Sequence, residues 1–474
     1  MKNVALHNLG CKVNSYEMDV MQQILQEKGY NIVPFDHAAD IYIVNTCTVT
    51  NIADRKSRQM LHRAKQLNPD AIVVAVGCYV QTGREAIERD DRIDLAVGNN
   101  RKKDIAVILE EFLKERERLS GDRQSLSQDG SHRDSAEQDG YPRESVMEDK
   151  TLGGTTVIDM AHADEYEEVT LRQTAEHTRA YIKIQDGCNQ FCSYCAIPYA
   201  RGRVRSRRPE DVENEIRGLV AAGFKEVVLT GIHISSYGID FEGKRSYSGE
   251  SGLIALIEQI HSVEGLERIR LGSLEPRIMT EDTVRRLSRL PKLCPHFHLS
   301  LQSGSDTVLK RMNRHYTTGE YYTGVEHLRK YFSHPAITTD VIAGFPGETE
   351  EEFAETADFL EKVRFYEMHI FKYSRREGTA AASMRGQVPE QIKTQRSNVL
   401  LAMEKRQSAE FRRYYIGSEA EVLLEEEKEI NGVPYLVGHT KDYVKAAVKK
   451  APGMQVNRTV KVCFKELLTE EILA

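Results

Sequence analysis

Three cysteines within eight residues constrain this chain more than any other feature of its sequence. Cys188, Cys192 and Cys195 follow the pattern C-x3-C-x2-C, just after an apolar run, Tyr181 to Ile184, and the turn pair Asp186-Gly187. One short loop can therefore aim three sulfur atoms at one point. Three thiolates suit a 4Fe–4S cluster, which cysteine sulfur holds, and they leave its fourth iron open. A structural zinc ion is the main alternative, but it prefers four protein ligands, and no fourth Cys or His lies within this loop.

The residues around these cysteines resemble the radical S-adenosylmethionine (SAM) superfamily, in which the open iron binds the amino and carboxylate groups of SAM. The longer string, from Asp186-Gly187-Cys188-Asn189 to Cys195-Ala196-Ile197-Pro198-Tyr199-Ala200-Arg201-Gly202, is similar to the methylthiotransferases of that superfamily. Within them it is most similar to the enzymes that methylthiolate N6-threonylcarbamoyladenosine in tRNA. The resemblance covers nearly the whole chain, apart from one insertion.

Composition is that of a globular protein without a membrane segment. The 474 residues are 40% hydrophobic and 29% charged, and the formal net charge is -7, so RNA binding would depend on local basic patches. The N-terminus lacks the apolar core of a signal peptide, and unpaired thiols with metal-type spacing fit a reducing compartment. We therefore expect a cytoplasmic protein that does not contact the membrane.

The first hundred residues alternate between strands and helices. Largely apolar strands separated by helices predict a parallel sheet with both faces covered. The expected strands are Val4 to Leu9, Ile41 to Asn45 and Ala71 to Val76, and the expected helices are Tyr16 to Lys28 and about Asp54 to Gln66.

Each of these strands runs into a cysteine: Cys11, Cys47 or Cys78. Ligands of open α/β sheets bind beyond the carboxyl ends of the strands, and neighbouring strands lie about 4.8 Å apart, so three thiols there can share one cluster. The alternative is three small buried cysteines, since a free Cys often belongs to the core. The resemblance favours the cluster: Asn8 to Asn14 is similar to the opening motif of the threonylcarbamoyladenosine enzymes. In that family these three positions hold a second cluster, which carries the inserted sulfur.

Residues 113–173 change character. The stretch is rich in Ser, Asp, Glu, Gln, Arg and Gly, and the triplet Gln128-Asp129-Gly130 recurs as Gln138-Asp139-Gly140. Such a composition cannot bury enough apolar surface to offset chain entropy. We predict a disordered insertion between an N-terminal domain, residues 1–112, and a catalytic core, residues 174–406, and assign it no chemistry.

Six further β/α units follow and predict a partial barrel, which is also the fold that the resemblance implies. The expected strands are Arg179 to Ile184, Glu226 to Gly231, Arg268 to Leu271, His296 to Leu301, Ile337 to Ala343 and His369 to Tyr373. Barrel sites lie at the carboxyl ends of strands, where the cysteine loop also falls. The candidate SAM contacts at those ends are Thr230, Gly231, Ser273, Glu275, Gln302, Ser303, Asp340 and Gly344; ordinary strand-to-helix turns are the alternative.

Residues 407–474 read as a small antiparallel barrel that resembles the RNA-binding TRAM module of this family. Its alternative role is a structural cover for the catalytic domain. The candidate RNA contacts are Arg201, Arg203 and Arg205 beside the cysteine loop, Arg412 and Arg413, and Tyr435, Tyr443 and Lys445 in the small barrel. Arginines paired with neighbouring acids are the alternative for the first group. Cys294 and Cys463 are expected to be structural core residues.

The resemblance implies methylthiolation of C2 of N6-threonylcarbamoyladenosine at tRNA position 37, next to the anticodon, with two 4Fe–4S clusters and SAM. No catalytic side chain beyond the cluster ligands is expected. The expected partners are tRNA, a reductase or flavodoxin-type electron donor, and a sulfur donor. The alternatives are an enzyme that modifies isopentenyladenosine in tRNA or a ribosomal protein, and an RNA-binding iron–sulfur redox sensor that is not an enzyme.

Overall fold

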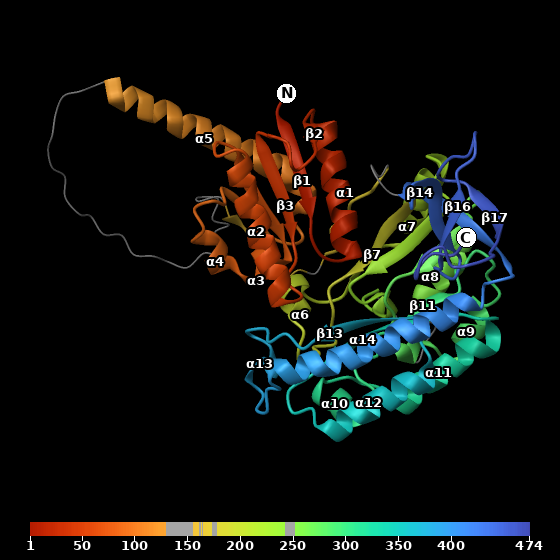
Figure 1. Cartoon of the computed structure of the whole chain (residues 1–474). Helices are drawn as coiled ribbons and strands as arrows, with labels where there is room; N and C mark the ends of the chain where they lie inside the picture. Colours follow the sequence, from red (N-terminus) through yellow and green to blue (C-terminus); the bar gives the residue numbers. More distant parts are fainter. Residues whose placement is uncertain (129–154, 161–162, 164, 173–177, 242–251) are drawn as a thin grey trace. The chain divides into compact units, whose positions relative to one another are not determined.

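The computed structural model describes residues 1–128, 155–160, 163, 165–172, 178–241 and 252–474 (Figure 1). They form two compact units. The N-terminal unit comprises Met1–Thr48, Ile52–Ala163 and Glu167–Val169, and the C-terminal unit comprises Val49–Asn51, Asp164–Tyr166 and Thr170–Ala474.

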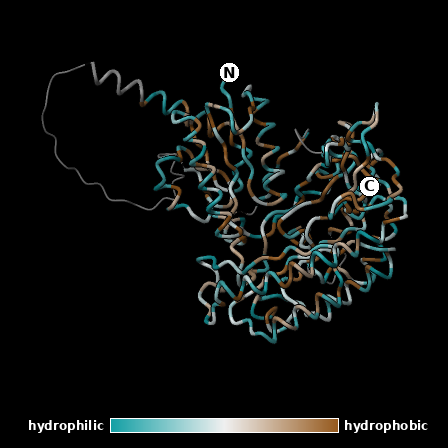
Figure 2. Tube along the Cα trace, viewed as in Figure 1, coloured by the Kyte–Doolittle hydropathy of each residue, from teal (hydrophilic) through white to brown (hydrophobic). Residues whose placement is uncertain are grey.

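The described part of the N-terminal unit is a parallel sheet between two helical layers. Its strands run in the order β2 (Asn31–Val33), β1 (Asn3–Asn8), β3 (Ile41–Thr46), β4 (Ile72–Gly77), β5 (Leu95–Val97) and β6 (Thr155–Thr156). Its helices are α1 (Lys12–Glu27), α2 (Asn51–Leu67), α3 (Cys78–Thr82), α4 (Arg84–Glu88), η1 (Lys102–Asp104) and α5 (Ile105–Gln128). Every residue of β3 and β4 is buried, and hydrophobic residues concentrate along these strands (Figure 2).

Side chains of the central strands point alternately to the two faces of the sheet, and they form two separate hydrophobic cores in this unit. Ile41 and Ile43 pack with residues of α1 and α5, whereas Tyr42 and Val44 pack with residues of α2. Because successive strand residues point to opposite faces, a run of apolar residues requires cover on both sides. The predicted parallel α/β domain is confirmed.

The predicted insertion contains ordered structure at both ends, so the expectation of disorder over 113–173 is wrong there. Helix α5 runs on to Gln128, and β6 pairs with β5 in the sheet. Thr156 and Met160 are buried, and the buried Glu167 carboxylate accepts a hydrogen bond from the Lys103 backbone N–H over 2.8 Å. Residues 129–154, where the repeated triplet falls in large part, lie outside the described residues.

The C-terminal unit is built on the predicted partial barrel. Its parallel strands are β7 (Arg179–Asp186), β9 (Glu226–Gly231), β10 (Arg268–Leu271), β11 (His296–His298), β12 (Ala336–Ala343) and β13 (Glu367–Lys372). They lie in two sheets, β10-β9-β7 and β11-β12-β13, and parallel bridges such as Leu274 to Leu299 join β10 to β11. The short β8 (Arg205–Ser206) is antiparallel to β7.

Helices follow the barrel strands in the described ranges of this unit. They are α6 (Ile197–Arg201), α7 (Pro209–Ala221), η3 (Ile234–Ser236), α8 (Gly252–His261), η4 (Pro276–Ile278), α9 (Glu281–Leu287), α10 (Asp306–Arg311), α11 (Thr318–Tyr331), α12 (Glu350–Val363), α13 (Ala380–Ser383) and α14 (Glu390–Arg413). Local signals start two of these helices: Pro209 opens α7, and Thr349 and Glu352 form both bonds of a capping box at the start of α12. Among the described helices, none has the length and apolar composition that a membrane crossing requires.

The predicted small antiparallel sheet closes the chain. Its strands are β14 (Glu419–Ile430), β15 (Val433–Thr440), β16 (Lys445–Lys449) and β17 (Thr459–Cys463), in the order β16-β15-β14-β17. Cys294 is fully buried, as expected, but Cys463 is exposed at the end of β17, so its prediction as a core residue is wrong.

Two buried arginines of strand β10 hold this sheet against the barrel. Arg268 donates hydrogen bonds to the backbone carbonyls of His439 and Glu421 over 2.9 and 3.0 Å, and Arg270 donates to that of Lys441 over 2.9 Å. Both arginines lie beside the fully buried Glu226 carboxylate. The sheet therefore covers the amino-terminal end of the barrel and leaves the carboxyl end, with the cysteine loop, for chemistry.

Candidate functional site

The cysteine loop is held by its own backbone and by two neighbouring segments. The Cys188 N–H donates to the carbonyl of Gly202 over 3.0 Å, and the Ser193 N–H donates to that of Met312 over 3.0 Å. Gly187 has a φ of +71°, and a Cβ there would lie 1.8 Å from the Arg203 carbonyl oxygen. Only glycine therefore fits the turn that brings Cys188 next to the end of β7.

The three cysteines line one cavity of about 140 Å³. Its other lining residues come from the loops after β7, β9, β10 and β11, from the start of α6 and from the loop after α10. They are Gln190, Tyr194, Ile197, Ile232, His233, Ser273, Leu274, Glu275, Ser300, Gln302 and Arg314. The prediction that the spacing C-x3-C-x2-C gathers these sulfurs at one place agrees with this arrangement.

Spacing of the sulfurs favours a cluster over a single metal ion. A zinc ion bound at about 2.3 Å to each tetrahedral ligand brings its sulfurs within about 3.8 Å of one another. In the described part of the chain, the three sulfurs do not all lie within 4.8 Å of one another. A four-iron cluster, whose ligands bind different iron atoms, suits this wider set of donors.

Charge and hydrogen bonds around the sulfurs suit thiolate ligands. Burial raises the pKa of the Cys188 thiol to about 11 and that of the Cys195 thiol to about 12, so these sulfurs need a positive partner to ionise at neutral pH. Arg314 supplies one cation: its Nη1 donates to Cys192 Sγ over 3.3 Å. The Gln190 backbone N–H donates to Cys188 Sγ over 3.5 Å.

Two buried polar atoms in the cavity fit a polar ligand such as SAM. Nε2 of His233 and Oε2 of Glu275 have no hydrogen-bond partner among the described residues. Burial and then the Arg314 charge lower the pKa of His233 to about 4, so this imidazole is neutral at physiological pH. Because an unpartnered buried polar atom is costly, a bound group that hydrogen-bonds to them would stabilise both side chains.

Of the predicted SAM contacts, Ser273, Glu275 and Gln302 line this cavity. The other five, Thr230, Gly231, Ser303, Asp340 and Gly344, are not among its described lining residues. Ser303 lies within hydrogen-bond reach of Thr356, and the Gly344 N–H donates to Glu348 over 2.8 Å, so these two have partners within the protein.

Sequence reasoning missed His233 and Arg314. His233 lies two residues after β9, so the rule of strand ends that selected Thr230 and Gly231 could have found it. Arg314 lies in the loop after α10, about 120 residues from the cysteines, and no local pattern marks it.

The other cysteine triad lies in the N-terminal unit, at one edge of its sheet. In the register of the sheet, Asn8 pairs with Asn45, and Asn45 pairs with Val76. Cys47 and Cys78 each come two residues after their paired strand residue, and Cys11 comes three residues after Asn8, so the three cysteines follow neighbouring strands at nearly the same height. Cys11 is exposed at the start of α1, whereas Cys47 and Cys78 are buried.

A glycine and a polar side chain lie directly beside two of these sulfur atoms. Gly10 has a φ of +110°, and a Cβ there would lie 3.1 Å from Cys47 Sγ. The buried Asn99 Nδ2 donates to Cys78 Sγ over 3.5 Å. The segment that carries Cys11 thus passes closely over Cys47, and the three predicted ligands gather at one edge of the sheet.

The predicted RNA contacts of Arg201 and Arg205 are wrong. Both side chains are buried: Arg201 donates to the Asp186 carboxylate over 3.1 Å, and Arg205 donates to the carbonyls of Arg201 and Arg203 over 3.0 Å. Their physical role is to neutralise a buried acid and bind backbone oxygens. Arg203 is exposed, with its guanidinium over the ring of Phe191.

Four of the remaining predicted RNA contacts line a groove of about 730 Å³ along α14 and the C-terminal sheet: Arg412, Arg413, Tyr443 and Lys445. Arg413 is exposed, whereas Arg412 is buried and donates to Ser408 over 2.7 Å. Tyr443 stacks on His296 and on His439, so it packs between the barrel and the sheet. Tyr435 is half-buried and outside this groove.

Comparison with known proteins agrees with this geometry. Residues 182–360 match the Radical SAM superfamily, and residues 3–98 match a family described as Uncharacterized protein family UPF0004. The solved structure of the radical S-adenosylmethionine methyltransferase TsrM from Kitasatospora setae, with cobalamin and a [4Fe-4S] cluster bound, has a similar fold. Its TM-score is 0.55 at 15% identity, over 80% of this chain and 74% of that one.

Relatives similar in sequence span almost the whole chain. Threonylcarbamoyladenosine tRNA methylthiotransferase MtaB from Bacillus subtilis is 38% identical over 98% of this chain and 93% of its own length. The protein of the same name from Aquifex aeolicus is 37% identical over 90% of this chain and 94% of its own. The tRNA-2-methylthio-N(6)-dimethylallyladenosine synthase from Carboxydothermus hydrogenoformans is 34% identical over 88% and 86%, respectively. The chain belongs to the radical SAM family of tRNA methylthiotransferases.

Proposed function

We propose that the protein methylthiolates C2 of N6-threonylcarbamoyladenosine at position 37 of tRNA, next to the anticodon. The observation that carries the proposal is the presence of two separate thiol triads, one lining a cavity with unpartnered polar atoms and one at a sheet edge in the other unit. Two relatives with this named activity, 38% and 37% identical, support the choice of substrate.

The residues of the cavity have distinct tasks in this reaction. Cys188, Cys192 and Cys195 hold a 4Fe–4S cluster, and Arg314 stabilises the thiolate of Cys192. His233 and Glu275 orient SAM. When bound, the cluster supplies the electron that cleaves SAM and so allows hydrogen to be removed from an unreactive C–H bond.

Cys11, Cys47 and Cys78 hold a second 4Fe–4S cluster, which carries the sulfur to be inserted. The side-chain amide of Asn99 donates to the Cys78 sulfur and would orient that ligand. The burial of Cys47 and Cys78 keeps water from two of the three ligands. A tRNA substrate, a reductase or flavodoxin-type electron donor, a sulfur donor and a cytoplasmic location complete the proposal.

One alternative is the same chemistry on isopentenyladenosine. The relatives named dimethylallyladenosine synthases support it less strongly, because they are 33–34% identical to this chain, whereas the Bacillus subtilis threonylcarbamoyladenosine enzyme is 38% identical. Methylthiolation of a ribosomal protein and a non-catalytic redox sensor are the others. A sensor has no use for unpartnered polar atoms on residues that line a cavity beside the thiols.

The test is mass spectrometry of nucleosides after reaction of the reconstituted protein, under anaerobic conditions, with two tRNAs. One carries N6-threonylcarbamoyladenosine and the other isopentenyladenosine at the same position. The proposal expects 2-methylthio-N6-threonylcarbamoyladenosine from the first and far less product from the second. Product from the isopentenyl tRNA alone would contradict the proposed substrate, and product from neither would contradict the activity.

A further inference from the structure

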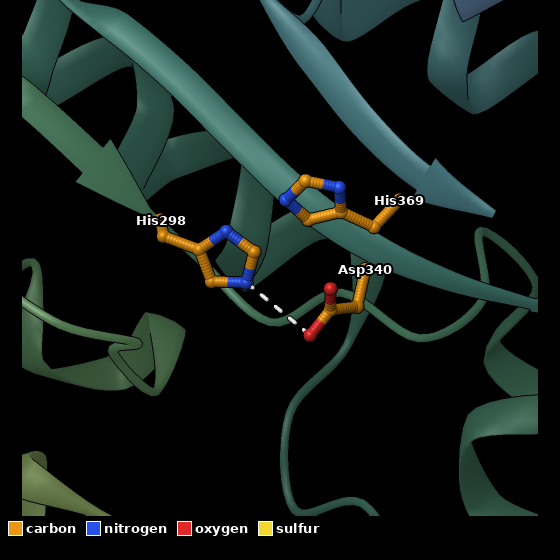
Figure 3. A group of neighbouring side chains, drawn as sticks. All are labelled: His298, Asp340 and His369. Atoms are coloured by element: carbon orange, nitrogen blue, oxygen red, sulfur yellow. Dashed lines mark ion pairs between the residues drawn. The ribbon is translucent and has the colours of Figure 1, made fainter. Parts of the chain in front are cut away.

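Three side chains from neighbouring barrel strands meet outside the cysteine cavity (Figure 3). His298 ends β11, Asp340 lies in β12 and His369 lies in β13, where it pairs in register with Asp340. Nε2 of His298 lies 3.2 Å from Oδ2 of Asp340. The two imidazole rings are nearly parallel, with centroids 5.7 Å apart and an interplanar angle of 28°. We name these three residues the His–Asp–His cluster.

One side of the cluster is buried and the other reaches the surface. His298 is buried, and its Nδ1 is held 3.0 Å from Thr338 Oγ1, which sets the orientation of the ring. Asp340 is partly exposed and His369 is exposed. The cluster therefore presents a carboxylate and an imidazole to an incoming molecule, on a wall that buried hydrogen bonds keep rigid.

The cluster adjoins the wall of the cysteine cavity. Ser300 and Gln302, which line that cavity, follow His298 at alternate positions, and the Gln302 N–H donates to the backbone carbonyl of Asp340 over 2.9 Å. Since extended chain rises about 3.3 Å per residue, Ser300 and His298 lie about 7 Å apart. A base with its reacting carbon at the cavity can reach the cluster with a substituent of a few atoms.

The same three residues also have the composition of a metal site, with one ligand atom of each within 4.8 Å of those of the other two. In the structure, however, His298 and Asp340 bind each other directly. The arrangement instead offers hydrogen-bond donors and an acceptor side by side.

We propose that the His–Asp–His cluster binds the polar substituent on N6 of the substrate base. This inference rests on the proposed function, in which that substituent is a threonylcarbamoyl group. Such a group carries N–H donors on its carbamoyl linkage and a carboxylate on its threonine. The Asp340 carboxylate accepts from the N–H groups, and the His369 imidazole donates to the carboxylate. His298 holds Asp340 in place. An isopentenyl group, which has no polar atom, would gain nothing from these contacts.

The experiment measures binding of two anticodon stem-loop RNAs to the cluster-loaded protein. They have the same sequence and carry either N6-threonylcarbamoyladenosine or plain adenosine at the target position. The wild type should prefer the decorated RNA, and His369→Ala should reduce the preference by about tenfold, since a charge-assisted hydrogen bond is lost. The control is His37→Ala, because His37 is also exposed and lies 3.1 Å from a carboxylate, that of Asp36, in the N-terminal unit.

Several outcomes would overturn the inference. An unchanged preference in His369→Ala would do so, and so would equal binding of both RNAs by the wild type. A fall in bound metal beyond the cluster iron in His369→Ala would assign the residues to a metal site instead. Failure of the proposed function is distinguishable, because the wild type would then form no methylthiolated product on the decorated RNA whatever its binding preference.

Discussion

Arg314 donates a hydrogen bond from its Nη1 to the Sγ of Cys192 over 3.3 Å. The same side chain donates to the Tyr316 hydroxyl over 3.0 Å. Burial alone would lower the pKa of Arg314, but the groups around it, Tyr316 foremost, raise that pKa well above its ordinary value. A permanent cation is therefore fixed beside one sulfur of the cavity.

Replacing Arg314 with Gln should weaken SAM cleavage without removing the cluster. The loss of a cation beside a ligating sulfur destabilises the more negative, reduced cluster, so its reduction potential should become more negative. We expect 5′-deoxyadenosine formation to fall by about 10- to 100-fold, because changes to such outer partners have effects of that size. Redox titration followed by electron paramagnetic resonance measures the potential. A variant with wild-type potential and rate would mean that Arg314 has only a structural role.

His233→Asn should raise the SAM concentration needed for half-maximal 5′-deoxyadenosine formation by about tenfold, since one hydrogen bond to a buried polar ligand is lost. Initial rates at a series of SAM concentrations provide the measurement. Unchanged SAM dependence would remove His233 from the SAM site.

The contribution of His233 to the stability of the fold depends on pH in a definite direction. Its folded-state pKa is about 4, below the ordinary value of 6.5, so the unfolded chain binds a proton on this residue first as pH falls. His233 therefore favours folding less as pH drops from 6.5 towards about 4. Between about pH 7 and pH 8 the residue stays neutral, so the effect of His233→Asn on SAM dependence should be the same at both values.

Arg270→Ala should lower the free energy of unfolding by about 3 to 5 kcal/mol, because it leaves a buried charge without its main partner. Burial would raise the pKa of Glu226, but the Arg270 charge and hydrogen bond hold it below its ordinary value. The control is Arg286→Ala. Arg286 pairs with Glu258 near the surface, so this substitution should lower the free energy of unfolding by at most about 1 kcal/mol. Urea unfolding monitors both variants, and equal losses would contradict the assigned role of Arg270.

The sequence predicted the elements whose signals are local. All six barrel strands and three strands of the N-terminal sheet follow from apolar runs. The spacing of Cys188, Cys192 and Cys195 likewise identified a shared site. The short strands β2, β5 and β6 were missed because two or three residues carry no periodicity.

The burial or exposure of several side chains depends on contacts with residues distant in sequence, and the sequence did not predict it. The charges of Arg201 and Arg205 predicted a surface, yet Asp186 and two backbone carbonyls bind them in the interior. Cys463 falls in a strand, but strand membership does not say which face is covered, and its side is exposed. Burial of a polar side chain depends on partners distant in sequence.

The two clusters per chain that we propose predict about eight iron atoms and about eight sulfide ions after anaerobic reconstitution. Replacing Cys188, Cys192 and Cys195 together with Ala should leave about half of each, since the other triad lies in a different unit. Colorimetric iron and sulfide assays give the count. A triple variant that retains all its iron would contradict the two-site account.

The central claim is that the two triads have separable tasks, and one anaerobic reaction tests it by chromatography of two products. A variant with Ala at Cys11, Cys47 and Cys78 keeps the cavity lined by Cys188, Cys192 and Cys195, so it should still form 5′-deoxyadenosine with dithionite but no methylthiolated tRNA. Cys192→Ala should lose both products. If the first variant, with its remaining cluster shown intact, makes methylthiolated tRNA at the wild-type level, Cys11, Cys47 and Cys78 are core residues and the account of the N-terminal unit is wrong.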